Sequence, residues 1–239
     1  MKQNTSDSKI VNWGGYLAIS LLILLVLSIF IVRAGMWQQG LALYALCSVG
    51  AAITLGVFAL CLVLPGFAAL RRPLLMRSLL LLPGTLLFLG ILTGGKYPQI
   101  HDITTDVADP PVFAMAGEIR DKSANSLELD PQTIQQQLSA YPDIQTVHSN
   151  LDFAQAYAQA EKVAANLGWE ITRANRLSGE IEAVDTTKIM AFKDDIVIRV
   201  RRAEDGSVVD LRSASRVGKS DMGANSKRIR SFMAQFKLP

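Results

Sequence analysis

The segment Asp195-Ile-Val-Ile-Arg-Val-Arg-Arg-Ala-Glu-Asp-Gly-Ser-Val-Val-Asp-Leu-Arg-Ser-Ala-Ser-Arg216 decides the fold of the C-terminal part of the chain. Apolar and charged residues alternate on both sides of Asp205-Gly206, a dipeptide typical of the two-residue turn of a β-hairpin. With this turn, Arg201 is expected opposite Asp210. One face of the hairpin is then apolar and packs in a core, while the other face is charged.

The two faces differ sharply in composition. The apolar face carries Ile196, Ile198, Val200, Val209 and Leu211. The opposite face carries Arg199, Arg201, Asp210, Arg212 and Arg216. Upstream, residues 169–176 and 180–186 indicate a second hairpin, joined through Ser178-Gly179. Helical patterns cover residues 130–139 and 152–167, and a last helix is expected to begin near Ser220 or Asp221. We therefore predict an α+β domain over residues 97–239, a two-layer structure with an antiparallel sheet of about four strands and helices on one face.

Residues 1–96 have the composition of a membrane anchor. Three apolar runs, at about 13–33, 41–64 and 78–94, contain no charged residue apart from Arg33 at the end of the first, and each is long enough for a transmembrane helix. A cleavable signal peptide is the competing interpretation of the first run. That run is too long, and no small-residue cleavage site follows it. We predict three membrane spans, with Pro83-Gly84 as a possible kink in the third.

Basic residues near the membrane predict the orientation of these spans. The N-terminus and the loop before the third run carry Lys2, Lys9, Arg71, Arg72 and Arg77, and the other side carries Arg33 and Lys96. Positive residues concentrate on the cytoplasmic side. The C-terminal domain is therefore expected outside the cytoplasm, in the periplasm if the cell is Gram-negative and the membrane is its inner one. The orientation inverts if the third run does not cross.

Within the second run, Ser48, Ala52 and Gly56 recur every four residues. Such a stripe allows close approach of another helix, so it is a candidate contact with a membrane-protein partner. Small residues are also simply common in membrane helices. Both cysteines, Cys47 and Cys61, lie in the same run, so the C-terminal domain has no disulfide and no cysteine-based metal site. The positive net charge belongs to the anchor, which argues against nucleic acid as a partner.

Two stretches of the C-terminal domain carry a resemblance to a known family. The first is Tyr97-Pro-Gln-Ile-His-Asp-Ile-Thr-Thr-Asp106 with Asp109-Pro-Pro-Val-Phe113. The second runs from Glu182 to Ile229 and includes Val208-Val-Asp-Leu-Arg-Ser-Ala-Ser-Arg-Val-Gly-Lys-Ser-Asp-Met-Gly-Ala-Asn225. Together they resemble domain-of-unknown-function family 1499, in a form tethered to the membrane by three N-terminal spans. The resemblance implies no activity, substrate or cofactor.

Charged residues of the domain are distributed unevenly, with acids in its first half and arginines in its second. The basic candidates form a set with their polar neighbours: Arg199, Arg201, Asp210, Arg212, Arg216, Lys219, Asn225 and Arg228. The acidic opening segment, with its histidine, supplies His101, Asp102, Asp106 and Asp109. We favour an internal network in which these acids pair with the arginines and fix the opening segment on the sheet. The alternative is a site for an external phosphate, carboxylate or lipid head group near the start of the last helix.

No set of residues in the sequence predicts catalysis. His101 lies near three aspartates along the chain, but proximity in a coil does not supply the geometry of a catalytic or metal site. The stretch Ser213–Ser220 resembles a nucleotide-binding P-loop, yet it lacks the first glycine and follows an antiparallel strand. We therefore predict no catalytic residue, metal or cofactor. The leading hypothesis is a non-catalytic binding or assembly module of the cell envelope. The alternatives are an envelope enzyme for an anionic substrate, using His101 with Arg212 or Arg216, and a subunit of a membrane complex.

Overall fold

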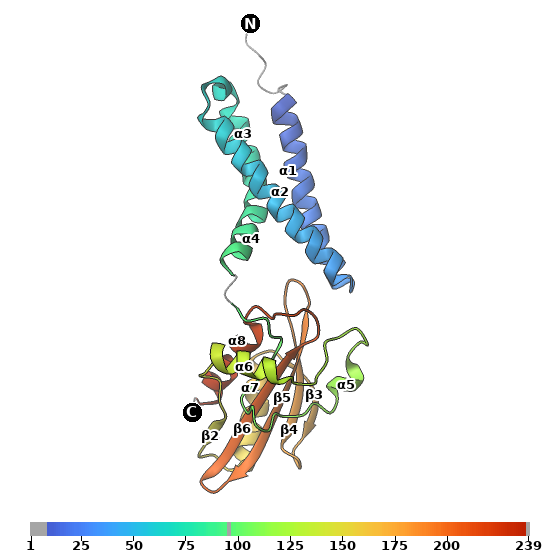
Figure 1. The fold of residues 1–239 in the computed structure, drawn as a ribbon, viewed down its shortest axis with the longest axis vertical. Helices are drawn as coiled ribbons and strands as arrows, with labels where there is room; N and C mark the ends of the chain where they lie inside the picture. Colours follow the sequence, from blue (N-terminus) through green and yellow to red (C-terminus); the bar gives the residue numbers. More distant parts are fainter. Residues whose placement is uncertain (1–8, 95–96, 238–239) are drawn as a thin grey trace. The chain divides into compact units, whose positions relative to one another are not determined.

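The computed structural model describes residues 9–94 and 97–237, and the chain divides into two compact units, one up to residue 95 and one from residue 96. The first unit contains the apolar helices, and the second is an α+β domain (Figure 1).

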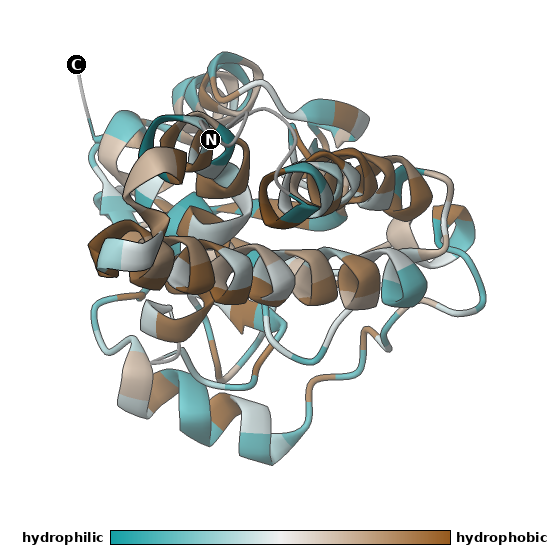
Figure 2. Cartoon of the chain, turned by 90° about the horizontal axis from the view of Figure 1, so that it is seen from above, coloured by the Kyte–Doolittle hydropathy of each residue, from teal (hydrophilic) through white to brown (hydrophobic). Residues whose placement is uncertain are grey.

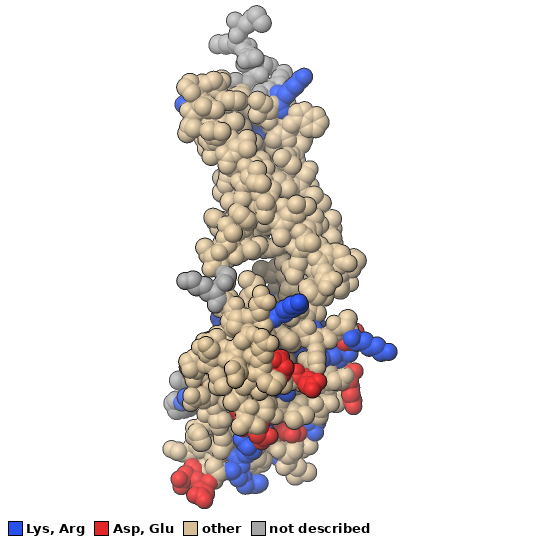
Figure 3. Space-filling view, in the orientation of Figure 1, with Lys and Arg blue, Asp and Glu red and all other residues tan. Residues whose placement is uncertain are grey.

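Three helical stretches of the first unit are long and apolar enough to cross a membrane, as predicted. They are α1 (Lys9–Arg33), α2 (Trp37–Val63) and a composite third stretch. Helical segments dominated by apolar residues are conspicuous in Figure 2. In Figure 3 the surface of this unit is nearly free of charged side chains between its two ends. Such a surface is suited to lipid, where a charged side chain is costly.

The third stretch is longer and less regular than expected. A 3-10 turn (Pro65–Leu70) leads into α3 (Arg71–Ser78), a second 3-10 turn follows (Leu79–Leu81), and α4 (Leu82–Thr93) completes it. Pro83 lies in the first turn of α4 and has no N–H to donate to the preceding turn, which accounts for the irregularity just before it.

The small residues of α2 pack mainly inside the unit. Gly84 of α4 approaches α2 so closely that a Cβ on it would lie 2.7 Å from the Cβ of Ala51. Of the predicted stripe, Ser48 is buried beside this contact and Ala52 is half-buried. Gly56 is exposed, with nothing near the position that its Cβ would occupy. The close helix contact is therefore made by Ala51 and Gly84.

The second unit is built on one antiparallel sheet in the order β1-β6-β5-β4-β3, with β2 also paired to β6. Its long strands are β4 (Glu180–Thr186), β5 (Lys193–Ala203) and β6 (Gly206–Ser215), and β3 (Glu170–Asn175) closes one edge. Two short strands, β1 (Asp102–Thr104) and β2 (Val147–Ser149), share the other edge of β6. The predicted fold class is confirmed, but the sheet has six strands instead of about four.

The turn of the central hairpin lies one residue earlier than predicted, which shifts the pairing of its two strands by two residues. Glu204 and Asp205 form the turn, Ala203 pairs with Gly206, and Arg199 lies opposite Asp210. Gly206 takes a backbone φ of +132°, which few other residues adopt, as the first residue of β6. A shift of two residues leaves every side chain on its predicted face.

The apolar face of the sheet is covered by α7 (Phe153–Asn166) and α8 (Ala224–Phe236). Asp152 and Gln155 form a capping box at the start of α7, which explains why this helix could be predicted closely. The buried aromatic pair Trp169 and Phe232 stacks in this core with ring centroids 5.8 Å apart. In Figure 1, α7 lies behind the sheet, and the short helix α5 (Ala116–Ile119) is seen to the right of it.

A further helix, α6 (Pro131–Ala140), protects the edge formed by β1. The buried side chain of Gln137 accepts a hydrogen bond from Thr104 N at 3.0 Å and donates one to Thr104 O at 2.6 Å. The amide thus takes the place of a neighbouring strand and satisfies both backbone groups of Thr104.

Candidate functional site

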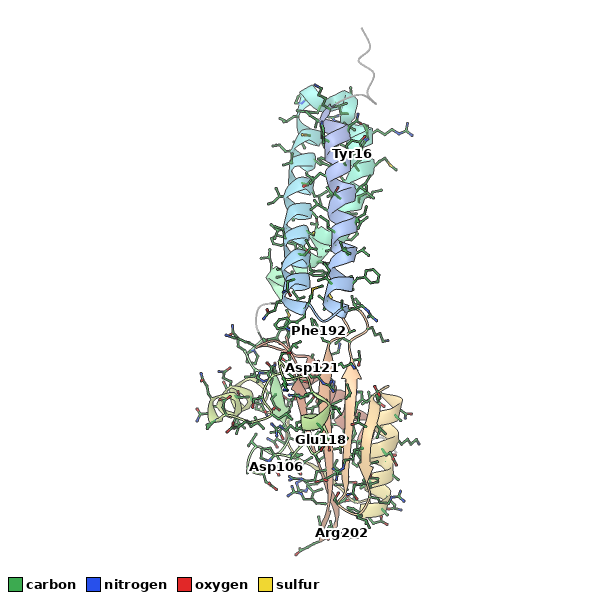
Figure 4. The ribbon with its side chains drawn as sticks, turned by 90° about the vertical axis from the view of Figure 1, so that its right-hand side faces the viewer. Tyr16, Asp106, Glu118, Asp121, Phe192 and Arg202 are labelled. Carbon is green, nitrogen blue, oxygen red and sulfur yellow. The ribbon has the colours of Figure 1, made fainter. Side chains whose placement is uncertain are left out.

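Residues 105–130, here called the overlay segment, cross the charged face of the sheet. Asp106 and Glu118 mark two points along this segment in Figure 4. Its side chains, carbonyl groups and backbone N–H groups bond to charged residues of β5, β6 and β4. The charged face is therefore covered by the protein itself over much of its area.

The outer part of this face joins two arginines to three aspartates. The buried carboxylate of Asp210 lies 2.6 Å from Nη2 of Arg201 and 3.4 Å from Nη2 of Arg199. Asp106, from the overlay segment, bridges the same guanidinium groups at 3.2 Å and 3.1 Å. The exposed Asp109 reaches Nη1 of Arg199 at 3.0 Å. Each guanidinium is thus shared by several carboxylates of the same chain.

The pKa of Asp106 lies below its ordinary value. Partial burial pushes this pKa upward, but hydrogen bonds from the backbone N–H groups of Asp109 and Ala108 and the charges of Arg201 and Arg199 outweigh that effect. The ionised form of Asp106 is therefore the one that the folded domain favours.

Arg212 is buried in the middle of the charged face. Its Nε and Nη2 atoms bind both oxygens of the buried Asp102 at 3.1 and 2.8 Å, in a bidentate pair. The same guanidinium donates to the carbonyl groups of Pro111 and Leu127 in the overlay segment. The ring of Phe113 lies over it, 5.1 Å from the guanidinium carbon. Arg212 thus fastens β1 and two points of the overlay segment to β6.

A second buried ion-pair cluster is centred on Asp195, whose carboxylate binds two arginines. Arg216 binds it through Nη2 and Nε at 2.7 and 3.0 Å, and Nε of Arg120 binds it at 2.6 Å. Arg120 also donates to the carbonyl groups of Asn125 and Ala214. These contacts secure the far part of the overlay segment to the sheet.

Glu182 provides a third attachment, which the sequence did not indicate. Its buried carboxylate accepts hydrogen bonds from the backbone N–H groups of Ala114, Met115 and Ala116 at 2.9 to 3.1 Å. These N–H groups lie at the start of α5, where intrahelical partners are lacking. Arg173 approaches the same carboxylate at 3.3 Å.

Arg228 was grouped with the charged face, but the structure places it on the opposite side of the sheet. It is buried among Asp194 at 2.6 Å, Asp185 at 2.8 Å and the side chain of Asn225 at 2.6 Å. Asn225 in turn donates to the carbonyl of His101 and to the hydroxyl of Ser215. This set joins α8 to the sheet and to the start of β1.

The start of the last helix is neutralised by its own chain. Helix α8 begins at Ala224, three residues later than the expected Asp221, because Met222 and Gly223 have positive φ angles. The carboxylate of Asp221 accepts from Gly223 N at 2.9 Å and from Asn225 N at 2.7 Å. Burial raises the pKa of Asp221, against the lowering effect of these two hydrogen bonds. The N–H groups of Gly223 and Asn225, at the start of the helix, are therefore already bound.

His101 and Lys219 lie apart from these ion pairs. They line a polar hollow of about 330 Å³ together with Gln99, Asn125, Asp130, Gln132, Thr133 and Gln136. A neighbouring hollow of about 580 Å³ lies along α6 and shares Gln132 and Gln136 with the first. Within residues 9–94 and 97–237, no group of three or more His, Cys, Asp or Glu side chains could hold a metal ion.

Comparison with known families places this arrangement in context. A family model described as a protein of unknown function, DUF1499, matches residues 102–236, which is more than half of the chain. The chain belongs to the DUF1499 family. The match begins at the first residue of β1 and ends at the last residue of α8, so it covers the sheet, both core helices and the overlay segment. No curated protein matches the sequence.

The charged residues that were predicted to form one set are therefore divided among three places in the DUF1499 domain. Asp102, Asp106 and Asp109 lie with Arg199, Arg201 and Arg212 on one face of the sheet, whereas Arg228 lies on the other and Lys219 lines the hollow. The partners that sequence reasoning missed are Arg120, Glu182, Asp185, Asp194 and Asp195. Two of these, Asp194 and Asp195, could have been predicted. Neighbouring residues of a strand point to opposite faces of the sheet, so two adjacent acids indicate a partner for an arginine on each face.

Proposed function

We propose that this DUF1499 protein is a non-catalytic binding module of the cell envelope, held by three membrane spans with its domain outside the cytoplasm. The orientation is supported by the five basic residues on the N-terminal side of the anchor against two on the other. A reporter that is active only outside the cytoplasm, fused after Pro239, is expected to function. Activity of a cytoplasm-only reporter at the same position would contradict this orientation.

The observation that carries the binding role is the polar surface beside α6. The smaller hollow is lined by amide, hydroxyl, imidazole, ammonium and carboxylate groups, and the larger one by glutamine and serine side chains together with Pro98, Pro131 and Ala140. Amide and hydroxyl groups both donate and accept hydrogen bonds, which suits a polar ligand such as an extended peptide or a glycan. Lys219 and His101 favour an anionic group on that ligand, since the carboxylate in the same lining, Asp130, already accepts hydrogen bonds from the backbone N–H and the hydroxyl of Thr133.

The enzyme alternative has less support from the same geometry. It requires His101 and an arginine to converge on one substrate atom. Arg212 is bound to Asp102, and Arg216 is bound to Asp195. His101 lines the hollow with Lys219 instead. A hydrolytic or transfer reaction would therefore have to disrupt a buried ion pair before an arginine could reach the substrate.

Site-specific photo-crosslinking in living cells tests the binding role with the intact protein. A photoreactive amino acid is placed at Gln132, which is exposed and lines both hollows, or at Lys162, which is exposed on α7. We expect an adduct from position 132 and none from position 162, with a weaker adduct after Lys219→Ala. Equal adducts from both positions, or none from position 132, would contradict the proposal.

A further inference from the structure

At one end of the DUF1499 sheet lie the chain that leads in from the anchor and three loops. These are the β4–β5 loop, the loop between β6 and α8, and the loop around Lys122. Strands β1 and β5 begin there and β4 and β6 end there, since Thr186 pairs with Lys193 and Asp102 pairs with Ala214. We call this the linker end. In Figure 4, Phe192 marks this end of the domain, and Arg202 marks the opposite end.

The chain holds the linker end close to a membrane surface by its length alone. Helix α4 ends at Thr93, and Ile100 is the first fully buried residue of the domain. The seven Cα–Cα steps between them span at most about 25 Å when fully extended. Whatever the orientation of the domain, its linker end cannot move far from the bilayer in which the third span ends.

Apolar side chains are exposed at this end. Ile189 in the β4–β5 loop is 65% exposed, Met222 in the loop before α8 is 57% exposed, and Tyr97 is 49% exposed. Single exposed apolar residues are ordinary on protein surfaces. Three of them at the end nearest the lipid are of the type that enters the interface between lipid and water.

The loops that carry these side chains are well bonded. In the β4–β5 loop, Phe192 N donates to the hydroxyl of Thr187 at 2.9 Å, and Thr187 N donates to the carbonyl of Phe192 at 2.8 Å. The ring of Tyr97 lies so close to Gly223 that a Cβ there would be 2.5 Å from it. The exposed side chains are therefore presented by fixed backbone.

The charge of the linker end suits an anionic lipid surface. Lys122, Lys188 and Lys193 are exposed there, next to the exposed Asp121 and the partly exposed Asp185, which pairs with Arg228. The acids at the start of β5, Asp194 and Asp195, are buried against arginines. Each basic residue near a membrane surface adds to the attraction for anionic head groups.

From the short linker, the exposed apolar residues and the lysines, we propose that the linker end docks on the anionic surface of the bilayer that holds the anchor. Ile189 and Met222 enter the head-group region, and Lys122, Lys188 and Lys193 contact lipid phosphates. Lys219 lies at the same end but lines the polar hollow, so the docking surface does not depend on the ligand proposed for that hollow.

Fluorescence quenching by lipid tests this docking in the full-length protein. Cys47 and Cys61 are replaced by Ala, and a cysteine carrying an environment-sensitive dye is placed at Ile189 or at Leu177. Leu177 is 97% exposed in the β3–β4 turn, at the opposite end of the sheet, and is the matched control. The protein is placed in nanodiscs of phosphatidylcholine alone or with about 30% phosphatidylglycerol, each with a shallow spin-labelled lipid.

We expect the dye at position 189 to be quenched at least twofold more than the dye at position 177. We also expect Lys188→Glu with Lys193→Glu to reduce that difference at least twofold in the anionic discs. Equal quenching at the two positions would overturn docking. Quenching at position 189 that is the same in both lipid mixtures and insensitive to the charge reversal would contradict the claim that the linker end recognises anionic lipid. A dye at 189 shielded from aqueous iodide but not quenched by lipid would show that protein covers the loop, which also contradicts the proposal.

Discussion

Replacing Arg212 by methionine is expected to destabilise the domain strongly. Methionine keeps much of the apolar bulk of the arginine stem but removes the guanidinium group. Asp102 is then left buried without its bidentate partner, and the carbonyl groups of Pro111 and Leu127 lose a donor. The change therefore tests whether the charged face of the sheet is a structural network.

The magnitude follows from the burial of the pair. Removing one partner of a buried ion pair typically costs about 3–5 kcal/mol, because the remaining charge is uncompensated. The free energy of unfolding of a domain is only about 5–15 kcal/mol. With a urea dependence of about 2 kcal/mol per molar, the midpoint of unfolding should fall by about 2 M.

Tryptophan fluorescence gives a direct reading of this loss in the full chain. Of the three tryptophans, only Trp169 lies in the DUF1499 domain, where it is buried against Phe232. Replacing Trp13 and Trp37 by Phe leaves it as the sole reporter. Urea titration of the detergent-solubilised protein then follows unfolding of the domain alone.

Arg230 supplies the matched control. It forms a bidentate pair with Asp143 at 2.6 and 2.7 Å, but both side chains are largely exposed. Exposed pairs contribute about 0–1 kcal/mol, so Arg230→Met should shift the midpoint little. In a double-mutant cycle, Arg212→Met and Asp102→Asn should couple by about 1–3 kcal/mol. A loss for Arg212→Met no larger than that for Arg230→Met would refute the reasoning.

Three further predictions concern individual carboxyl groups. The pKa of Asp106 is lowered in the fold, so its stabilising contribution is complete above the unfolded pKa of about 4 and is lost as the pH falls through the folded value. Asp106→Asn should therefore reduce the fall of the urea midpoint between about pH 6 and pH 3. The pKa of Asp221 is raised, so its ionisation opposes folding as the pH rises, and Asp221→Asn should change the same slope in the opposite direction. Slopes equal to that of the parent chain in both variants would contradict the assignment. Glu182→Gln should lower the free energy of unfolding of the domain by about 1–3 kcal/mol, because the single oxygen of an amide cannot accept hydrogen bonds from all of the N–H groups at the start of α5. Limited proteolysis should then cut residues 112–120 faster, and an unchanged rate would show that Glu182 does not hold this segment.

Local patterns of the sequence predicted the larger elements well. The alternation around the central hairpin, the capping box of α7 and the apolar runs of the anchor each depend on residues close together in the chain. The strands β1 and β2 were missed because each has three residues, too few to show alternation. They are strands because the free edge of β6 supplies their hydrogen bonds.

The candidate site was harder to predict, because its partners are distant in sequence. Opposite charges in the two halves of the domain indicated pairing between Asp102 and the arginines, and the structure contains that pairing. Which arginine meets which acid depends on the path of the overlay segment, and no local signal fixes that path. Glu182 and Arg120 illustrate the difficulty, since Glu182 binds the N–H of Ala116, 66 residues away, and Arg120 binds Asp195, 75 residues away.

Hydrogen–deuterium exchange of the overlay segment tests the central claim most directly. If the chain's own carboxylates and carbonyl groups hold this segment on the sheet, the amides of Ala114, Met115 and Ala116 should be protected, because Glu182 accepts all three. The exposed Leu177 turn should exchange rapidly in the same protein and serves as the internal comparison. Exchange of residues 114–116 as fast as that of the turn would show that the charged face is open to solvent and would contradict the account.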